Sequence, residues 1–252
     1  MSTTDFYDGL APYYHLLYPE WESAIQRQGV ALSSVLVDAG VRPGASVLDA
    51  ACGVGTQALG LAARGYRVHA SDISPGALGR CETEAASRGL SIETSIADLR
   101  TLTTTHRRPF SAVIACDNAL PHLLTDAEIG DALRECHACT APGGVAIFSV
   151  RDYAAIERKN PDVRPYGVRQ QGDSRYLAWQ VWDWEPDGTH YQVSLYLVED
   201  RGEPSCKTLV FRAHYYAIGI ERILRLMEDA GFSRCHRRDE VFFQPLLIGY
   251  RN

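Results

Sequence analysis

The segment from Val47 to Gln57, Val-Leu-Asp-Ala-Ala-Cys-Gly-Val-Gly-Thr-Gln, constrains the fold of this chain more than any other. It passes from an apolar run through a glycine turn into a helical pattern, which is typical of the first strand, loop and helix of a nucleotide-binding α/β sheet. Gly53 and Gly55 lack a Cβ, so the backbone can approach a ligand, and the following helix offers its N-terminal amides. The segment therefore predicts a nucleotide site at the end of a strand.

The first two thirds of the 252 residues alternate short apolar runs with longer amphipathic ones, as in successive βαβ units. This length suits one α/β domain with an insertion. The expected strands are Ser46–Asp49, Tyr66–Ser71, Ser91–Ile96, Phe110–Cys116 and Gly144–Val150. The expected helices are Trp21–Leu36, Thr56–Arg64, Pro75–Arg88 and Asp126–Cys139. The pattern favours a Rossmann-like sheet with helices on both faces.

After Arg151, the spacing of apolar residues changes from alternating strand and helix patterns to strand patterns alone. A polar, proline-containing stretch gives way to three alternating segments rich in β-branched and aromatic residues, which are Tyr176–Trp184, Tyr191–Glu199 and Thr208–Ala217. We expect them to form an antiparallel insertion, followed by a helix that Gly231 ends and by a last strand, Val241–Tyr250, that returns to the main sheet. The predicted units are an N-terminal helical cap (1–40), a cofactor-binding domain (41–151 and 218–252) and a substrate lid (152–217).

Three acidic residues lie at the ends of three successive predicted strands. Asp49 precedes Gly53 closely enough to repel a phosphate there, and it suits a phosphate-free ligand with a cationic amino-acid moiety, such as S-adenosylmethionine. Asp72 is spaced to accept hydrogen bonds from both ribose hydroxyls. Asp98 and Leu99 can meet the adenine amino group and the adenine ring face. Taken together, the three acids predict one crevice for a cationic nucleoside.

The overall charge disfavours nucleic acid as a partner. The 25 Lys+Arg residues against 31 Asp+Glu give a net charge of −6, whereas affinity for phosphate backbones requires clustered basic residues. Seven scattered cysteines fit reduced thiols in the cytoplasm, and Cys136 and Cys139 lack a second ligand pair for zinc, so no metal is expected. The chain shows no secretory signal and no apolar run long enough for a membrane span. A homo-oligomer is compatible with the sequence.

Several motifs resemble the class I S-adenosylmethionine-dependent methyltransferases, whose fold has a seven-stranded Rossmann-like sheet. The element order resembles that family from Asp5 to Tyr250, and it includes motif I at Leu48–Thr56, Asp72, Asp98-Leu99 and Pro142-Gly-Gly144. The resemblance is nearest to glycine and glycine/sarcosine N-methyltransferases. The segments that carry it are Phe6–Trp21, Cys116–Leu123 and Phe148–Tyr153.

The resemblance implies roles for individual residues toward the cofactor and its product, S-adenosylhomocysteine. Tyr14, Trp21 and Arg27 would close over the cofactor, with Arg27 near its carboxylate. The other implied cofactor contacts are Ala51, Gly53 and Gly55 in the loop, Asp72 and Ile73 at the ribose, Asp98 and Leu99 at the adenine, Cys116 beside the methionine portion, and His122. Asn118, Arg151 and Tyr153 match positions that hold an amino-acid carboxylate.

Two motifs depart from the family pattern and bear on catalysis. Asp117-Asn-Ala119 stands where the family has Gly-Asn-Ser, and Arg151-Asp-Tyr153 where it has Arg-Asn-Tyr. Asp117 would either accept a hydrogen bond from an amine or hydroxyl or cap its loop. An amine nucleophile needs alignment and no strong base, whereas a hydroxyl or carbon nucleophile gives Asp117 or His122 more proton transfer. We take Tyr14, His122 and Asp117 as catalytic candidates.

The sequence favours an enzyme that methylates a small molecule, by N-methylation of glycine, sarcosine or a related amino-acid-like acceptor. An alternative is an N-, O- or C-methyltransferase of a specialised metabolite. Two further hypotheses are an NAD-type oxidoreductase, because Gly53, Gly55 and Ala58 satisfy the dinucleotide pattern, and a non-catalytic cofactor-binding protein. Asp49 and the lack of an evident hydride-transfer set disfavour the oxidoreductase.

Overall fold

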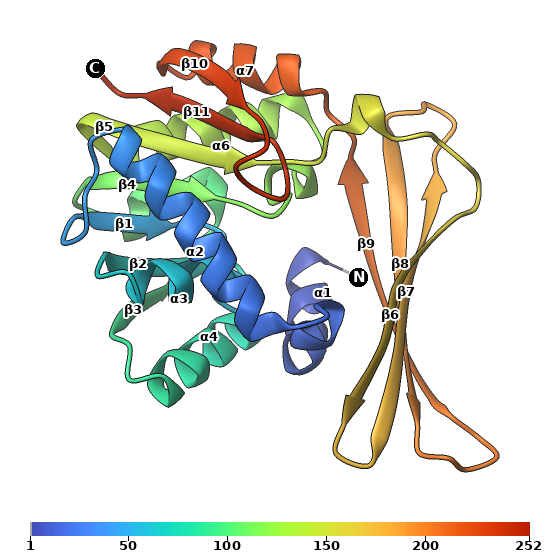
Figure 1. Cartoon of the computed structure of the whole chain (residues 1–252). Helices are drawn as coiled ribbons and strands as arrows, with labels where there is room; N and C mark the ends of the chain where they lie inside the picture. The colour runs from blue at the N-terminus through green and yellow to red at the C-terminus, as the bar shows by residue number, and fades with distance from the viewer. Residues whose placement is uncertain (1) are drawn as a thin grey trace.

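The computed structural model describes residues 2–252, which form two β-sheets (Figure 1). The larger sheet has seven strands in the order β10-β11-β5-β4-β1-β2-β3, and the smaller has four in the order β6-β7-β8-β9. The strands of the larger sheet are β1 (Ser46–Asp49), β2 (Arg67–Asp72), β3 (Ile92–Ile96), β4 (Phe110–Ala115), β5 (Thr140–Ser149), β10 (Ser233–Arg238) and β11 (Leu246–Tyr250). Those of the smaller sheet are β6 (Asp162–Gln171), β7 (Ser174–Trp184), β8 (His190–Asp200) and β9 (Lys207–Tyr216).

Helices occupy most of the remaining chain. The α-helices are α1 (Thr3–Leu10), α2 (Trp21–Asp38), α3 (Thr56–Ala62), α4 (Pro75–Ser87), α5 (Leu102–Thr105), α6 (Asp126–Cys139) and α7 (Ile220–Asp229). The 3-10 helices are η1 (Ala11–Leu17), η2 (Leu99–Thr101), η3 (Leu120–His122) and η4 (Tyr153–Ala155).

The alternation of side chains along the central strands creates two cores. Val47 of β1 packs with Leu32 and Leu36 of α2, in a cluster that also includes residues of α3 and α4. Leu48 points to the other face and packs with residues of α6 and α7, among them Leu133 and Met227. Helices therefore cover both faces of the seven-stranded sheet, as the sequence predicts.

The strand order reverses beside β1, and this reversal locates the site. Strand β1 pairs in parallel with β2 on one side and with β4 on the other. The connections after β1 and β4 diverge to opposite faces, so the carboxyl ends of these strands border a crevice, which is where open α/β sheets bind ligands. The edge of the main sheet that holds β10 and β11 is antiparallel, because β11 pairs antiparallel with both β5 and β10.

The four-stranded sheet extends the expected insertion by one strand. Three of its strands, β7 to β9, agree with the three predicted segments, but the polar stretch before them also forms a strand, β6. Its pattern is obscured by Pro165 and by an irregularity in the pairing between Pro165 and Gly167. An edge strand tolerates proline because one side of its backbone has no partner. The main sheet likewise gains β10, and the last strand begins at Leu246 rather than at Val241.

The first residues join the two sheets. Figure 1 shows α1 between the main sheet and the smaller one, and α1 contacts both α4 and β9. Phe6, Leu10 and Leu16 pack against Trp182 and Tyr191 of the smaller sheet. Helix α2, which the sequence assigns to the same N-terminal cap, instead packs on the main sheet. Of the described part of the predicted cap, residues 2–40, α1 and η1 therefore cover the carboxyl edge and α2 does not. The division into units at residues 40, 151 and 217 stays a prediction.

Candidate active site

The glycine loop between β1 and α3 adopts backbone conformations that favour glycine. Gly53 has φ 53° and Gly55 has φ 92°, both in the left-handed region. A Cβ on Gly55 would also lie 2.5 Å from the Cys81 Sγ. The Gly53 amide donates to Asp72 Oδ2 at 2.8 Å, and the Ser74 amide donates to Asp72 Oδ1 at 2.9 Å. The Asp72 carboxylate thus ties the loop to the end of β2.

A cavity of about 240 Å³ lies over this loop at the carboxyl edge of the sheet. Most of the cofactor residues predicted from sequence line it, so the structure brings them together. They are Tyr14, Ala51, Gly53, Asp72, Ile73, Asp98, Leu99, Cys116 and His122. Asp117 lines the cavity as well.

Four predicted cofactor residues do not line this cavity. Gly55 is the N-cap of α3, and Asp49 is buried below the loop. Arg27 is exposed on α2, away from the cavity lining. Trp21 contacts the cavity only through a second residue, because its Nε1 donates to Thr56 Oγ1 at 3.0 Å and Thr56 lines the cavity.

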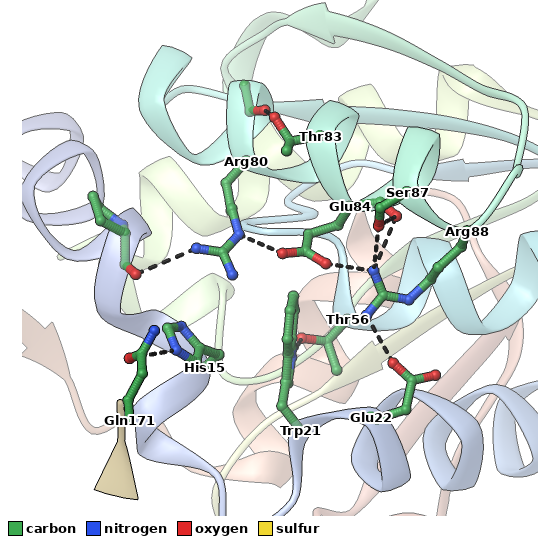
Figure 2. A network of polar contacts seen from close by, with 12 residues as sticks. His15, Trp21, Glu22, Thr56, Arg80, Thr83, Glu84, Ser87, Arg88 and Gln171 are labelled. Atoms are coloured by element: carbon green, nitrogen blue, oxygen red, sulfur yellow. Dashed lines mark hydrogen bonds and ion pairs between the residues drawn. The ribbon is translucent and has the colours of Figure 1, made fainter. Parts of the chain in front are cut away.

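A network of polar contacts holds Trp21 in place (Figure 2). The guanidinium groups of Arg80 and Arg88 each lie 5.6 Å from the centre of the indole ring, and Glu84 forms ion pairs with both. Arg80 also donates to the Pro12 carbonyl at 3.3 Å. The network therefore fastens η1, which covers the site, to α4.

Asp98 already has a cationic partner within the chain. Arg100 forms an ion pair with the Asp98 carboxylate at 2.6 Å and reaches Glu128 at 2.6 Å as well. The hydrogen bonds from Arg100 lower the pKa of Asp98 below its usual value. The carboxylate is thus ionised and fixed at the cavity wall, as a group that receives an N–H donor should be.

Asp49 is the most perturbed carboxyl group near the cavity. It is 1% exposed, and within residues 2–252 neither of its oxygens has a hydrogen-bond partner. Burial, reinforced by the negative charge of Asp72, raises the pKa of Asp49 to about 8. An uncompensated buried carboxyl group below the loop fits a ligand that carries positive charge and disfavours a pyrophosphate.

We expect the affinity for S-adenosylmethionine to rise with pH up to about pH 8, because a cationic ligand favours the ionised form of Asp49. Below that pH a proton must be released on binding, so the affinity falls by up to about tenfold per pH unit. Without ligand, the same raised pKa makes folding stability decrease as the pH rises from the ordinary carboxyl value to about 8, since only the unfolded chain then releases the proton.

Calorimetry over this pH range, in buffers of different ionisation enthalpy, measures both the affinity and the protons released. Asp49→Asn should bind with little pH dependence, whereas Asp131→Asn, at an exposed position on α6, should behave as the wild type. An unchanged pH dependence in Asp49→Asn would contradict the assignment of the proton to Asp49.

A second cavity, of about 410 Å³, meets the first. Both are lined by Tyr7, Tyr14 and Asp117. The second cavity is further lined by Phe6, Leu10, Leu17, Tyr18, Arg151, Tyr166, Gln180, Tyr215, Phe243 and Gln244. A group bound in one cavity can therefore approach a group bound in the other.

The loop after β4 holds Asp117 in an unfavourable backbone conformation. Asp117 has φ 55° and Asn118 has φ 67°, which side chains other than glycine rarely adopt. Ser149 maintains this turn, because its Oγ accepts from the Asp117 amide at 2.7 Å and its carbonyl accepts from the Asn118 amide at 2.9 Å. The backbone at Asp117 is thus strained, and this conformation places its carboxylate at the boundary of the two cavities.

Two tyrosines orient that carboxylate. Tyr14 donates to Asp117 Oδ2 at 3.1 Å and Tyr18 donates to the same oxygen at 3.3 Å. Burial and the nearby charge of Asp117 raise the pKa of Tyr14 well above its usual value, so Tyr14 stays a hydrogen donor at neutral pH. Asp117 Oδ1 forms no hydrogen bond within residues 2–252 and remains available as an acceptor.

Arg151 lines the second cavity among aromatic rings. Its guanidinium carbon lies 5.4 Å from the centre of the Trp182 ring and 6.0 Å from that of Tyr215. No carboxylate of residues 2–252 forms an ion pair with Arg151. A half-buried cation without an acidic partner is incompletely compensated, so Arg151 favours an anionic ligand.

Asn118 and Tyr153, predicted as substrate contacts, support Arg151 instead of lining either cavity. Asn118 is 1% exposed, and its Oδ1 accepts from the Arg151 amide at 3.0 Å. Its Nδ2 donates to the Tyr153 hydroxyl at 2.9 Å, and that hydroxyl lies 2.8 Å from the Tyr191 hydroxyl. These residues fix the backbone from which Arg151 extends, and their contact with a substrate stays a prediction.

His122 is a neutral ring at the cavity wall. Its Nε2 is 2.8 Å from the Tyr7 hydroxyl, and its ring centre lies 4.2 Å from that of Tyr215. Burial, together with the positive charge of Arg151, lowers the pKa of His122 to about 3. A group with that pKa is a poor general base near neutral pH.

Four tyrosines of the second cavity have no role predicted from the sequence, namely Tyr7, Tyr18, Tyr166 and Tyr215. They come from α1, from the segment after η1 and from the smaller sheet. Tyr7 and Tyr18 lie within the N-terminal segment that carries the family resemblance, which was a signal for them. Tyr166 lies on the unpredicted strand β6.

Comparison with known proteins agrees with this geometry. A family model described as a methyltransferase domain matches residues 47–144. A glycine/sarcosine N-methyltransferase of Parasynechococcus marenigrum is 27% identical over 219 residues, which cover 85% of this chain and 71% of that protein.

Solved structures share the fold over nearly the whole chain. The CcbJ methyltransferase of Streptomyces caelestis has a TM-score of 0.80 at 17% identity, covering 100% of this chain and 99% of that one. CalS10 of Micromonospora echinaspora, an amino pentose methyltransferase solved with S-adenosylmethionine, has a TM-score of 0.76 at 16% identity, covering 90% and 92%. Within residues 2–252, no helix has the length and apolar character to cross a bilayer.

Proposed function

We propose that this chain, a class I S-adenosylmethionine-dependent methyltransferase, N-methylates a small amino-acid-like acceptor, such as glycine, sarcosine or a related amine. The observation that carries the proposal is the pair Arg151 and Asp117, an unpaired cation and a strained carboxylate in one cavity that opens onto the cofactor cavity. An amino acid offers the complementary groups, namely a carboxylate and an amine.

The cofactor site is assigned to the cavity over the glycine loop. Asp72 would accept hydrogen bonds from the ribose hydroxyls, and Asp98 and Leu99 would meet the adenine. The buried, unpartnered Asp49 fits the cationic end of the cofactor. When bound there, S-adenosylmethionine supplies an electrophilic methyl group on a sulfonium.

The chain's own residues would position the acceptor. Arg151 would bind the acceptor carboxylate, and its planar fork suits that geometry better than lysine. Asp117 Oδ1 would accept the N–H of the amine, which aligns the nitrogen lone pair with the methyl group. With the methyl group supplied from the adjoining cavity, these two residues would hold the amine nitrogen in line to accept it, and the methylated nitrogen would then release a proton.

Asp117 is assigned as the group that takes up this proton or passes it to solvent. His122, with a pKa of about 3, serves as a neutral contact that orients Tyr7. Alignment of the reacting atoms by these groups can supply roughly 7–11 kcal/mol of the barrier reduction.

The test joins a binding measurement to an assay. Calorimetry with S-adenosylmethionine and S-adenosylhomocysteine should show binding of both. Incubation with glycine, sarcosine and a panel of primary and secondary amines should yield a product heavier by one methylene, detected by mass spectrometry. Failure to bind either cofactor form would reject the methyltransferase site, and binding without transfer to any amine would reject the acceptor class.

A second candidate is N-, O- or C-methylation of a specialised metabolite. The observation that favours it is the fold similarity to CalS10, whose acceptor is an amino pentose. Amino sugars without an acidic group belong in the same panel, because they would leave Arg151 without an anion. Preference for such a sugar would support this candidate.

A further inference from the structure

The acceptor cavity is large for the smallest amino acids. Its volume of about 410 Å³ lies in the range of about 300–1,000 Å³ that is typical of sites for drug-sized ligands. Glycine or sarcosine, held between Arg151 and Asp117, would leave most of this space to water. The cavity therefore fits a molecule with a further group beyond its carboxylate and amine.

Beside its tyrosines and glutamines, the lining of this cavity has a charged part and an apolar part. Asp117 and Arg151 come from the loops after β4 and β5, at the carboxyl edge of the main sheet. Phe6, Leu10 and Leu17 come from α1 and η1 and present apolar side chains to the same cavity. An acceptor that satisfies both walls carries charged groups at one end and an apolar body at the other.

Phe243 adds a contact at the exposed border of the cavity. Phe243 is 55% exposed, although it belongs to the cavity lining, and it lies in the segment between β10 and β11. Phe6 and Leu10, by contrast, are each 2% exposed. The apolar wall thus runs from a buried part to an exposed aromatic ring, and an apolar group bound along it would cover Phe243.

We propose that the preferred acceptor is an amino acid with a branched or aromatic apolar side chain, bound by its carboxylate at Arg151, by its amine at Asp117 and by its side chain along Phe6, Leu10 and Leu17. This inference rests on the proposed function and adds the side chain to it. The reaction is the methyl transfer already described, so the amine nitrogen of this acceptor would be methylated in the same way.

The size of the expected preference follows from apolar burial. One methylene in an apolar pocket changes kcat/KM by about 10- to 200-fold. Leucine and phenylalanine should therefore exceed glycine by at least about tenfold in kcat/KM. Phenethylamine keeps the ring of phenylalanine and lacks its carboxylate, so its kcat/KM should fall well below that of phenylalanine. Glucosamine, an amino sugar without an anionic group, should likewise be a poorer acceptor than phenylalanine.

Two variants at one position separate side-chain recognition from folding. Leu17→Trp fills part of the cavity and should lower kcat/KM for phenylalanine by at least about tenfold, with glycine affected little. Leu17→Ala removes a wall contact and should lower the phenylalanine value by a similar factor. Val37→Trp, at a 45% exposed position of α2 outside both cavities, is the matched control and should change neither.

The readouts distinguish the two levels of the proposal. Affinity for S-adenosylhomocysteine and the melting temperature report whether each variant is folded with an intact cofactor site. Bound cofactor without transfer to any amine would sink the proposed function itself. Transfer with glycine or sarcosine as the best acceptor, or a sugar preferred over phenylalanine, would overturn only the side-chain assignment, as would Leu17 variants that alter glycine and phenylalanine equally.

Discussion

Replacement of Arg151 by alanine is expected to lower kcat/KM for a carboxylate-bearing acceptor by about 10²- to 10³-fold. Removal of one member of a buried charged pair costs about 2–5 kcal/mol. In the proposed complex, the partner left unpaired by this substitution is the acceptor carboxylate. Arg151 has no acidic partner within residues 2–252, so little of this loss can come from a broken internal ion pair. Steady-state kinetics with the amino acid and with its carboxylate-free amine analogue measures the effect.

The rate with the carboxylate-free amine distinguishes a role of Arg151 in acceptor recognition from a structural role. Arg151→Ala should barely change the rate with the amine, because that acceptor never used the guanidinium group. Arg151→Lys should lie between alanine and wild type, since a point charge replaces a planar fork. Arg212→Ala removes an exposed arginine of β9, in the smaller sheet and outside both cavities, and should have no effect. Equal losses for both acceptors in Arg151→Ala would assign Arg151 a structural role only.

The main sheet could be predicted because its signals are local. A short apolar strand, two glycines with positive φ and a helix follow one another between residues 46 and 62, and each signal lies within a few residues of the next. Strand β6 could not be predicted in the same way. Its residues are polar and include Pro165, and only pairing with β7, through long-range contacts, makes it a strand.

The same distinction between local and long-range signals applies to the residues of the site. Asp72 and Asp98 follow strands of a parallel sheet, so their meeting at one edge follows from the fold. Asn118 could not be assigned a supporting role from sequence, because that role depends on Arg151 and Tyr153, which follow it by more than thirty residues. The position of Arg27, exposed on α2, depends on how α2 packs, which the sequence pattern does not specify.

The backbone strain at Asp117 accompanies one of the two departures from the family pattern. A glycine at this position would adopt the left-handed conformation freely, whereas aspartate adopts it at some cost, and here the amides of Asp117 and Asn118 donate hydrogen bonds to Ser149 that hold the turn. Neither sequence periodicity nor composition reveals such strain. The Asp117 carboxylate lines both cavities.

Asp72→Ala should weaken the binding of S-adenosylmethionine and S-adenosylhomocysteine by about 10²- to 10³-fold, the second large effect that we expect. The Asp72 carboxylate accepts from the amides of Gly53 and Ser74 and is only 8% exposed. Hydrogen bonds to a charged group contribute about 1.5–3 kcal/mol each. Alanine would release the glycine loop and remove the acceptor assigned to the ribose, so both effects act on the same ligand.

Calorimetric titration with S-adenosylhomocysteine measures this loss directly, and the thermal shift on ligand addition measures it independently. Asp72→Asn keeps the shape and one acceptor oxygen, so its loss should be smaller than that of alanine. Asp173→Ala, in the exposed turn between β6 and β7, removes the same functional group far from the loop and should bind as the wild type does. Wild-type affinity in a folded Asp72→Ala variant would show that the cofactor does not bind over the glycine loop, because that loop would have lost its principal anchor.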